Sequence, residues 1–238
     1  MKDWRLIYII FAKSEDKLYI SNKNRQAYFV LLSVCIIFVR INLKNCNVMF
    51  DKETYVQRRA LLKKNIGSGV LLFLGNDEQG LNYEDNAFRY RQDSTFLYYF
   101  GLSFAGLSAI IDIDEDKEII FGDELTIDHI VWMGTQPTLK EKSERVGIRE
   151  TLPSAAIISY LHKAVQKGQT VHYLPPYRPE HKLKLMDWLG IPPARQEGSV
   201  PFIRAVVAQR NYKSAEEIAE IEKACDVTAD MHIKAMEV

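Results

Sequence analysis

Short apolar runs alternate with segments of helical spacing from residue 49 to the end of the chain. The run 69–75 is bounded by glycines, and the runs 107–113 and 118–121 are joined by the acidic turn 114–116. A turn this short joins antiparallel strands, whereas strands separated by helices can run parallel. The pattern therefore predicts an α/β fold, a three-layer sandwich in which a mixed β-sheet lies between two layers of helices.

The predicted strands and helices cover most of the chain after residue 49. We expect strands at 69–75, 107–113, 118–121, 130–133 and 170–174. We expect helices at 51–65, 138–146, 154–166, 179–190 and 214–238. The first helix places Asp51 at its N-cap, and its predicted buried side is formed by Tyr55, Val56, Ala60 and Leu62.

The 31 basic residues of this 238-residue chain equal its 31 acidic residues, which gives a formal net charge of zero. Proteins that bind nucleic acids or acidic membranes carry a basic excess, which this chain lacks. The longest apolar run, 27–39, has thirteen residues, fewer than the roughly 20 that span a bilayer. We therefore expect neither nucleic acid nor a membrane among the partners of this protein.

The three cysteines are Cys35, Cys46 and Cys225, and no two of them have the CxxC spacing of a metal-binding or redox pair. Three cysteines are too few for a disulfide framework. We therefore expect a reducing compartment and a cytoplasmic location.

Residues 1–48 differ in composition from the rest of the chain. They contain no glycine and no proline, whereas residues 49–238 contain all 12 glycines and all 8 prolines. They also carry eight basic and three acidic residues, a net charge of +5. Our hypothesis is that translation begins at Met49. The alternative is a true N-terminal extension that contains a short buried strand or helix.

A long helix is predicted at 214–238. Ser214 and Glu217 have the spacing of a capping box, in which each side chain binds the backbone N–H of the other residue. Residues at helical spacing follow: Ile218, Ile221, Cys225, Thr228, Met231 or His232, and Met236. An apolar stripe of this length requires a packing partner. We divide the chain into a doubtful extension at 1–48, a domain at 49–210, and a linker with one helix at 211–238.

The sequence contains no HExxH, GxSxG, Walker or GxGxxG motif. On one strand Asp112 and Asp114 would share a face and could hold Mg²⁺ or Mn²⁺. The alternative is a solvated hairpin turn, where Asp is common. The five histidines do not pair at the spacing of a metal site on one element. We assign no catalytic residue and no metal ligand to this chain.

The segment 88–101 is dense in aromatic and charged residues. Arg91 and Asp93 are candidates for a charge-assisted pair that orients the segment. We expect it to be anchored in a core or an interface by Phe96, Tyr98, Tyr99 and Phe100. Because clusters of aromatic residues with arginine also mark binding hot spots, a structural role and an interface role are both open.

The same segment resembles the "FRQDSxFxYLTGF" signature of the N-terminal domain of aminopeptidase P, an Xaa-Pro aminopeptidase. The residues on this signature are Arg91, Gln92, Asp93, Ser94, Phe96, Tyr98 or Tyr99, and Gly101. Tyr90 stands where the family has Phe. Three further matches follow in the order of the family. Arg58-Arg59 followed by Leu61 resembles its opening helix, residues 132–134 with 147–148 resemble its "WxG…GI" segment, and residues 213–224 resemble the entry into its catalytic domain. The resemblance covers residues 49–238, about four fifths of the chain.

This resemblance implies an α/β domain that takes part in oligomer contacts and covers the active site of a larger enzyme. In the family, a following "pita-bread" domain holds two metal ions, commonly manganese, through two Asp, one His and two Glu. These metals activate the water that cleaves the peptide bond before a proline in second position. The sequence matches only the first helix of that domain, so none of the five ligands can be assigned.

The resemblance further implies that the whole enzyme acts on peptides with penultimate proline and forms a homo-oligomer. We expect this chain alone to be inactive and to bind no cofactor, because the manganese ions belong to the missing catalytic domain. The candidate signature or interface residues are Arg91, Asp93, Ser94, Phe96, Tyr98, Tyr99 and Trp132.

Three alternatives are open. The chain could be a stand-alone oligomerisation or binding module, whose interface would be the aromatic segment and the helix at 214–238. It could be the corresponding part of a prolidase or a creatinase, which share the architecture. It could also be a divalent-metal nuclease with Asp112 and Asp114 as ligands, although the neutral net charge argues against this.

Overall fold

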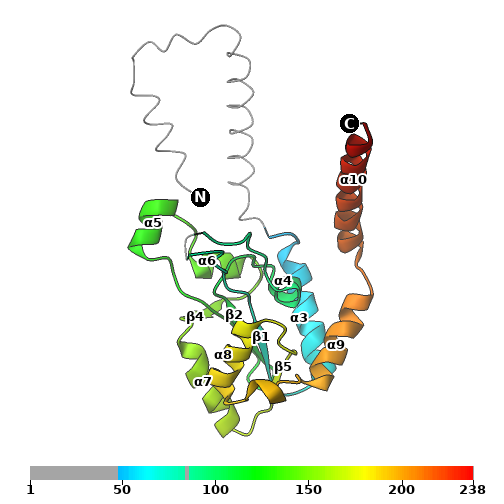
Figure 1. Cartoon of the computed structure of the whole chain (residues 1–238). Coiled ribbons are helices and arrows are strands. Elements are labelled where there is room, and N and C mark those ends of the chain that lie inside the picture. The colour runs from blue at the N-terminus through cyan, green and yellow to red at the C-terminus, as the bar shows by residue number, and fades with distance from the viewer. Residues whose placement is uncertain (1–47, 84–85, 238) are drawn as a thin grey trace. The chain divides into compact units, whose positions relative to one another are not determined.

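The computed structural model describes residues 48–83 and 86–237 (Figure 1). Leu125–Pro137 belongs to a compact unit separate from the one that holds Phe50–Glu124 and Thr138–Val238. The expectations for Cys35, Cys46 and the remainder of residues 1–47 lie outside the described residues. None of the described helices has both the length and the apolar character needed to cross a bilayer.

Five short strands form one mixed sheet in the larger unit. They are β1 (Val70–Leu74), β2 (Ser108–Asp112), β3 (Lys117–Phe121), β4 (Glu150–Leu152) and β5 (Val171–Tyr173). Their order in the sheet is β4-β3-β2-β1-β5. β2 pairs antiparallel with β1 and β3, whereas β5 runs parallel to β1 and β4 runs parallel to β3. The predicted mixed sheet is confirmed, and the acidic turn joins β2 to β3 as expected.

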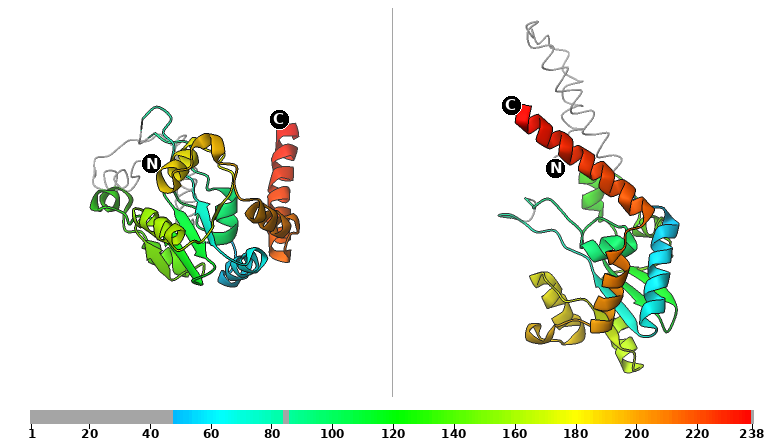
Figure 2. Two further views of the ribbon diagram at one scale, coloured as in Figure 1. Left: turned by 90° about the horizontal axis from the view of Figure 1, so that it is seen from below. Right: turned by 90° about the vertical axis from the view of Figure 1, so that its right-hand side faces the viewer.

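Helices cover both faces of this sheet. They are α3 (Lys52–Ile66), α4 (Ser94–Phe100), α6 (Leu139–Glu144), α7 (Ala156–Gln166), α8 (Pro179–Leu189) and α9 (Val200–Asn211), with a 3₁₀ turn at Pro193–Arg195. α7 and α8 lie on one face of the sheet, and α3, α4 and α9 lie on the other (Figures 1 and 2). This arrangement confirms the predicted three-layer sandwich.

The alternation of side chains along β1 divides the core between the two faces of the sheet. Val70 and Leu72 are buried against side chains of α7 and α8. Phe73 lies on the opposite face, with its ring centroid 5.4, 5.0 and 5.1 Å from those of Tyr99, Phe100 and Phe202. β1 is therefore covered on both faces, which explains its continuously apolar sequence.

The strand predicted at 130–133 is wrong, because these residues lie in α5 (Ile127–Met133), in the separate compact unit. The side chain of Thr126 caps this helix by accepting a hydrogen bond from the backbone N–H of His129. Gly134 ends the helix, as expected for the end of the element. A short apolar run fits either a strand or a helix, and the threonine cap favours the helix.

The buried side of α3 matches the predicted one only in part, at Tyr55 and Leu62. Its buried residues are Tyr55, Arg58, Arg59 and Leu62. Val56 and Ala60, which we expected on the buried side, are exposed. Asp51 occupies the N-cap position, but its side chain makes no cap hydrogen bond. The two arginines replace the predicted apolar residues because their side chains find buried hydrogen-bond partners, described below.

Two helices on the same face as α3 were not predicted. α4 has only seven residues and follows a capping aspartate inside the aromatic segment. α9 has twelve residues and carries proline in its first turn. An apolar period cannot be recognised over seven residues, whereas proline at the start of α9 was an available indication of a helix.

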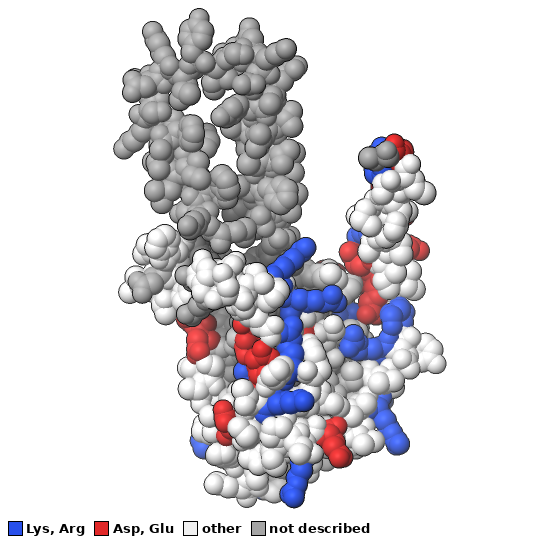
Figure 3. Space-filling view, viewed as in Figure 1, with Lys and Arg blue, Asp and Glu red and all other residues white. Residues whose placement is uncertain are grey.

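α10 (Ala215–Glu237) confirms the predicted C-terminal helix. The backbone N–H of Ser214 donates to Glu217 Oε2 at 3.0 Å, and that of Glu217 donates to Ser214 Oγ at 3.3 Å, so the capping box is formed. No residue of α10 is buried, and the side seen in Figure 3 is largely uncharged. Its exposed apolar side chains are Ile218, Ile221, Val227, Met231, Ile233 and Met236. Cys225 is free and exposed.

Candidate functional site

The aromatic segment 88–101 ends in α4, and Asp93 begins this helix. Asp93 Oδ1 accepts hydrogen bonds from the backbone N–H groups of Thr95 and Phe96, each at 2.9 Å. This cap satisfies two of the N–H groups that a helix leaves unpaired at its start. Gly101 ends α4 in the left-handed conformation, with φ of 62°. A close approach of Tyr55 also leaves no room for a Cβ at Gly101.

Gln92, rather than a pair of Arg91 with Asp93, orients the segment. In the described part of the chain that predicted pair does not form, since Asp93 binds the backbone and Arg91 is exposed. The side chain of Gln92 is buried. Its Oε1 accepts from the N–H groups of Asn76 (2.8 Å) and Asp93 (2.9 Å), and its Nε2 donates to the carbonyl of Phe104 (3.0 Å). Gln92 thereby ties the segment to the residues that follow β1.

A half-buried tyrosine and a buried histidine hold the ends of the same loop. Tyr90 Oη donates to the carbonyl of Phe104 at 2.9 Å, and burial raises the pKa of its hydroxyl. His181 of α8 has its Nε2 3.1 Å from the carbonyl oxygen of Gly75, directly after β1. Burial lowers the pKa of His181, so this imidazole is neutral near pH 7 and can donate to the carbonyl.

Arg59 is fully buried and connects four elements. Its Nε lies 2.7 Å from Glu118 Oε2 in β3. Its two terminal nitrogens donate to the carbonyls of Tyr99, in α4, and Val146, after α6, each at 2.9 Å. Burial lowers the pKa of the guanidinium, and the charge and hydrogen bond of Glu118 oppose this shift. Lys63 Nζ binds the other oxygen of Glu118 at 3.0 Å.

Arg58 lies among aromatic rings and reaches the first turn of α10. Its guanidinium carbon is 4.0 Å from the ring centroid of Tyr98 and 4.8 Å from that of Phe50. Its Nη1 donates to the carbonyl of Tyr98 at 2.9 Å. Its Nη2 lies 3.4 Å from Glu217 Oε1, in the capping box of α10. Arg58 therefore ties the start of α10 to α3 and α4.

The last turn of α9 completes this arrangement. Tyr99 Oη donates to Gln209 Oε1 at 2.7 Å, and Gln209 Nε2 donates to the carbonyl of Arg58 at 2.9 Å. Arg210 Nη1 donates to Thr95 Oγ1 at 3.0 Å. The residues that we call the arginine junction are Arg58, Arg59, Tyr98, Tyr99, Gln209 and Glu217.

The predicted candidates have different places in this site. Tyr98 and Tyr99 belong to the arginine junction, and Phe96 is fully buried in the same helix. Ser94 is exposed at the first position of α4. Trp132 is 71% exposed on α5, in the separate compact unit, and is not part of the junction.

The sequence identified Arg58, Arg59 and Gln92 as family matches and Glu217 as a capping-box residue, but it gave none of them a role in this site, and it did not single out Gln209. The spacing of the buried positions 55, 58, 59 and 62 on α3 is helical and was available in the sequence. It was overlooked because arginine is rarely buried unless it is paired. No pattern in the sequence identified the partners of Gln92 and Gln209, which come from distant segments.

The acidic turn is a hairpin turn and not a pair of metal ligands. Asp112 is the last residue of β2, so Asp114 lies in the turn and not on the same strand face. Asp112 accepts hydrogen bonds from Tyr160 Oη (2.8 Å) and Gln169 Nε2 (2.9 Å). Asp114 accepts from Gln169 Nε2 (3.0 Å) and from the N–H of Gly69 (3.0 Å). Both carboxylates are therefore used in holding the turn.

The donor set expected of a two-metal centre is not found in the described part of the chain. Among residues 48–83 and 86–237, no group of three or more His, Cys, Asp or Glu side chains is placed to hold a metal ion. The described residues therefore do not fit a manganese site.

Comparison with known proteins gives consistent matches. The sequence model of the family described as aminopeptidase P, N-terminal domain, matches residues 55–173. A probable Xaa-Pro aminopeptidase of Chaetomium globosum is 28% identical over 168 residues, which are 69% of this chain and 27% of that protein. The Xaa-Pro dipeptidase of Homo sapiens is 33% identical over 76 residues, 31% of this chain and 15% of that protein.

Solved structures have the same fold. The Pseudomonas aeruginosa aminopeptidase PepP is similar with a TM-score of 0.67 and 25% identity, over 81% of this chain and 46% of that one. Aminopeptidase P from E. coli in its low-pH form gives a TM-score of 0.64 at 22% identity, over 79% of this chain and 45% of that one. This chain spans about a quarter of the Chaetomium protein and less than half of each solved enzyme. The family match runs from α3 to the end of β5 and takes in the whole sheet. The chain belongs to the family of aminopeptidase P N-terminal domains.

Proposed function

We propose that this chain is the substrate-capping and oligomerisation portion of a metal-dependent Xaa-Pro aminopeptidase. Such an enzyme removes the N-terminal residue from peptides that have proline in second position. The chemistry belongs to a catalytic domain outside the described residues, which holds two manganese ions. The chain alone is inactive, acts within a homo-oligomer and works in the cytoplasm, where the free thiol of Cys225 is compatible with a reducing environment.

The arginine junction is the observation that carries this proposal. It ties the aromatic segment, which bears the family signature, to the first turn of α10 through Arg58 and Glu217. A helix with a continuous apolar face requires a surface that covers it, and no residue of α10 is buried. The sequence at 213–224 resembles the beginning of the family's catalytic domain. The junction therefore sets the direction in which that domain begins.

A chimeric enzyme tests the proposal. Residues 48–237 of this chain replace the structurally matching part of the Pseudomonas aeruginosa aminopeptidase, and release of the N-terminal residue is measured in the presence of Mn²⁺. We expect cleavage of a peptide with proline in second position and none of the same peptide with alanine there. The chain alone should release nothing. Cleavage by the chain alone, or a chimera no more active than the catalytic part without any N-terminal domain, contradicts the proposal.

A matched pair of variants connects this test to the junction. In the chimera, Glu217→Gln removes the carboxylate partner of Arg58. Glu220→Gln changes a carboxylate on the same helix whose ion pair is with Lys223. We expect the first variant to lower activity and the second to leave it unchanged. Equal activities of the two variants would show that the junction does not position the catalytic domain.

The stand-alone module is the second candidate function, and the exposed apolar face of α10 is the observation that favours it. A module that dimerises through α10 predicts a well-behaved dimer of the full chain and a monomer of a chain that ends at Asn211. The proposed enzyme portion predicts poor solubility of the full chain, improved by the same shortening. Size-exclusion chromatography with light scattering on both lengths separates the two outcomes.

The length of the preferred substrate tests whether this chain belongs to a prolidase or a creatinase instead of an Xaa-Pro aminopeptidase. The similarity to the human Xaa-Pro dipeptidase covers 31% of this chain, whereas that to the Chaetomium Xaa-Pro aminopeptidase covers 69%. We therefore favour longer peptides over dipeptides as substrates. The natural enzyme that contains this chain should cleave an Xaa-Pro tripeptide faster than the corresponding dipeptide, and the reverse order would favour a prolidase.

A further inference from the structure

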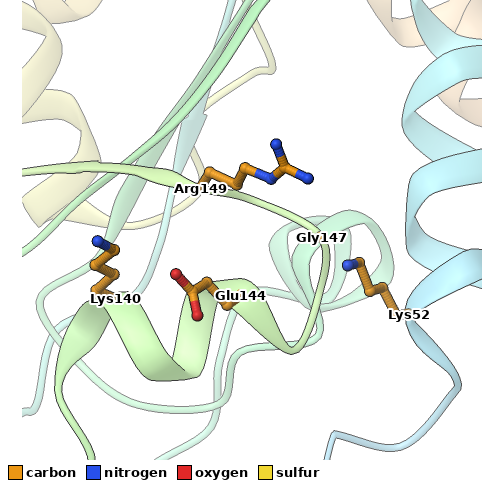
Figure 4. Close-up of a pocket in the computed structure, with 5 residues that line it drawn as sticks. All are labelled: Lys52, Lys140, Glu144, Gly147 and Arg149. Atoms are coloured by element: carbon orange, nitrogen blue, oxygen red, sulfur yellow. The ribbon is translucent and has the colours of Figure 1, made fainter.

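A charged hollow lies at the surface of the larger unit, between α3, α6 and the loop that leads to β4 (Figure 4). Its volume is about 330 Å³, which falls at the lower end of the range for small-molecule sites. The residues that line it are Lys52, Lys140, Glu144, Gly147 and Arg149. None of them belongs to the arginine junction.

The charges of this hollow are not balanced. Three basic side chains and one carboxylate give it a formal charge of +2, although the whole chain is neutral. Among the described residues, none of these four side chains takes part in an ion pair. The single carboxylate of Glu144 leaves two positive charges unbalanced, and an anion placed between two cations offsets their mutual repulsion.

The geometry places two of the cations around the same space. Arg149 reaches over the hollow from the strand side, and Lys52 extends towards Gly147 from the first turn of α3 (Figure 4). Lys140 and Glu144 lie together on α6, on the other side of the hollow (Figure 4). One end of the hollow is therefore purely cationic, and the other end carries both signs of charge.

Gly147 makes this close approach possible. It has φ of +84°, and a Cβ at this position would lie 2.6 Å from Val56 Cγ2 and 3.4 Å from Lys52 Cε. The loop can therefore pack directly on α3 only because residue 147 has no side chain. This packing holds the aliphatic part of Lys52 beside the loop that carries Arg149. The two cations therefore come from two segments that pack against each other.

We propose that this hollow binds a small oxyanion, a phosphate or carboxylate group, between Arg149 and Lys52. The planar guanidinium of Arg149 donates two parallel hydrogen bonds to such a group, and the ammonium of Lys52 adds a point charge. Lys140 attracts a second acidic group of the same ligand, and Glu144 accepts from a hydroxyl or ammonium group. The fitting ligand is a small polar molecule with at least one oxyanion and one donor group.

The test uses the full chain labelled with ¹⁵N, titrated separately with inorganic phosphate and with succinate at constant ionic strength. We expect saturable shifts of the Gly147 amide and the Arg149 Nε signals. Arg149→Gln and Lys140→Gln should each weaken the apparent affinity, Arg149→Gln by at least about tenfold, the factor for loss of one of its two charge-assisted hydrogen bonds. Lys182→Gln, which removes an exposed lysine of α8, should leave the affinity unchanged.

Each outcome decides the proposal. Saturation with phosphate alone or with succinate alone supports the site and identifies the oxyanion that it prefers, and saturation with both supports a general oxyanion site. Shifts that never saturate, or that weaken equally in Lys182→Gln and Arg149→Gln, overturn it, because they show only general screening of surface charge. The amide spectrum of each variant verifies that the fold is retained, and Lys140→Gln provides an independent test if Arg149→Gln perturbs the loop.

Discussion

Replacing Arg59 by methionine tests whether the arginine junction holds the domain together. Methionine has a similar length and fits an apolar environment, but it has no charge and donates no hydrogen bond. In Arg59→Met, Glu118 loses a partner at 2.7 Å, and the carbonyls of Tyr99 and Val146 each lose a donor at 2.9 Å. These acceptors are buried or partly buried, so water does not freely replace the lost donors.

The expected cost follows from the partners that are left behind. Removing one member of a buried ion pair typically costs about 3–5 kcal/mol. Glu118 keeps a second cation, because Lys63 Nζ lies 3.0 Å from its other oxygen. We therefore expect the lower end, about 3 kcal/mol of unfolding free energy. In a domain of this size such a loss lowers Tm by about 6–12 °C.

Urea and thermal unfolding of the full chain, followed by circular dichroism, measure this change. The double variant Arg59→Met with Glu118→Met should be more stable than Arg59→Met alone, because it removes a carboxylate that has lost one of its two cations, while Lys63 keeps Asp116 as a partner. Lys167→Gln, which removes an exposed ion pair with Glu115, serves as the control and should unfold like the original chain. A loss below about 1 kcal/mol in Arg59→Met, or no recovery in the double variant, refutes the reasoning.

Three further predictions concern the aromatic segment and a buried histidine. Asp93→Ala removes the cap of α4 and should cost about 1 kcal/mol in urea unfolding, whereas Asp93→Asn should cost less. Gly101→Ala should lower Tm more than Gly106→Ala, because both have positive φ but only at Gly101 would a Cβ meet the Tyr55 ring at 2.5 Å; equal losses would contradict this. Burial lowers the pKa of His181, so the unfolded chain binds the extra proton and Tm should fall as the pH drops below about 6.5. His181→Gln should make that decline shallower, and an unchanged pH profile would argue against it.

Local patterns were sufficient to predict most of the fold. The glycine-bounded run that became β1, the acidic hairpin between β2 and β3, and the capping box of α10 each contain their own boundary residues. The strand predicted at 130–133 is wrong because a four-residue apolar run fits either a strand or a helix, and the residue that decides between them, the N-cap Thr126, lies outside the run. The prediction is correct where a segment has both a recognisable apolar pattern and residues that mark its ends.

The site was less predictable, because its hydrogen bonds join residues far apart in sequence. Gln209 binds Tyr99 and Arg58 across 110 and 151 positions of the chain. Asp93 had an obvious charged neighbour in Arg91, yet it binds the backbone of α4, because helix N–H groups are closer and have no other acceptor. Pairing Asp93 with the nearest opposite charge in the sequence therefore predicted an ion pair that the structure does not contain.

The chemistry of α4 explains why an aspartate precedes this aromatic helix and why two arginines of α3 pack against it. A seven-residue helix has nearly all of its backbone groups in its two ends, and burying it leaves N–H and carbonyl groups without partners. Asp93 satisfies the N-terminal end, and the two arginines of α3 satisfy the carbonyls of Tyr98 and Tyr99 at the C-terminal end. Both charges also have the sign that the helix dipole favours. Because Arg58 then reaches Glu217, the same residues that allow α4 to be buried also fix the first turn of α10.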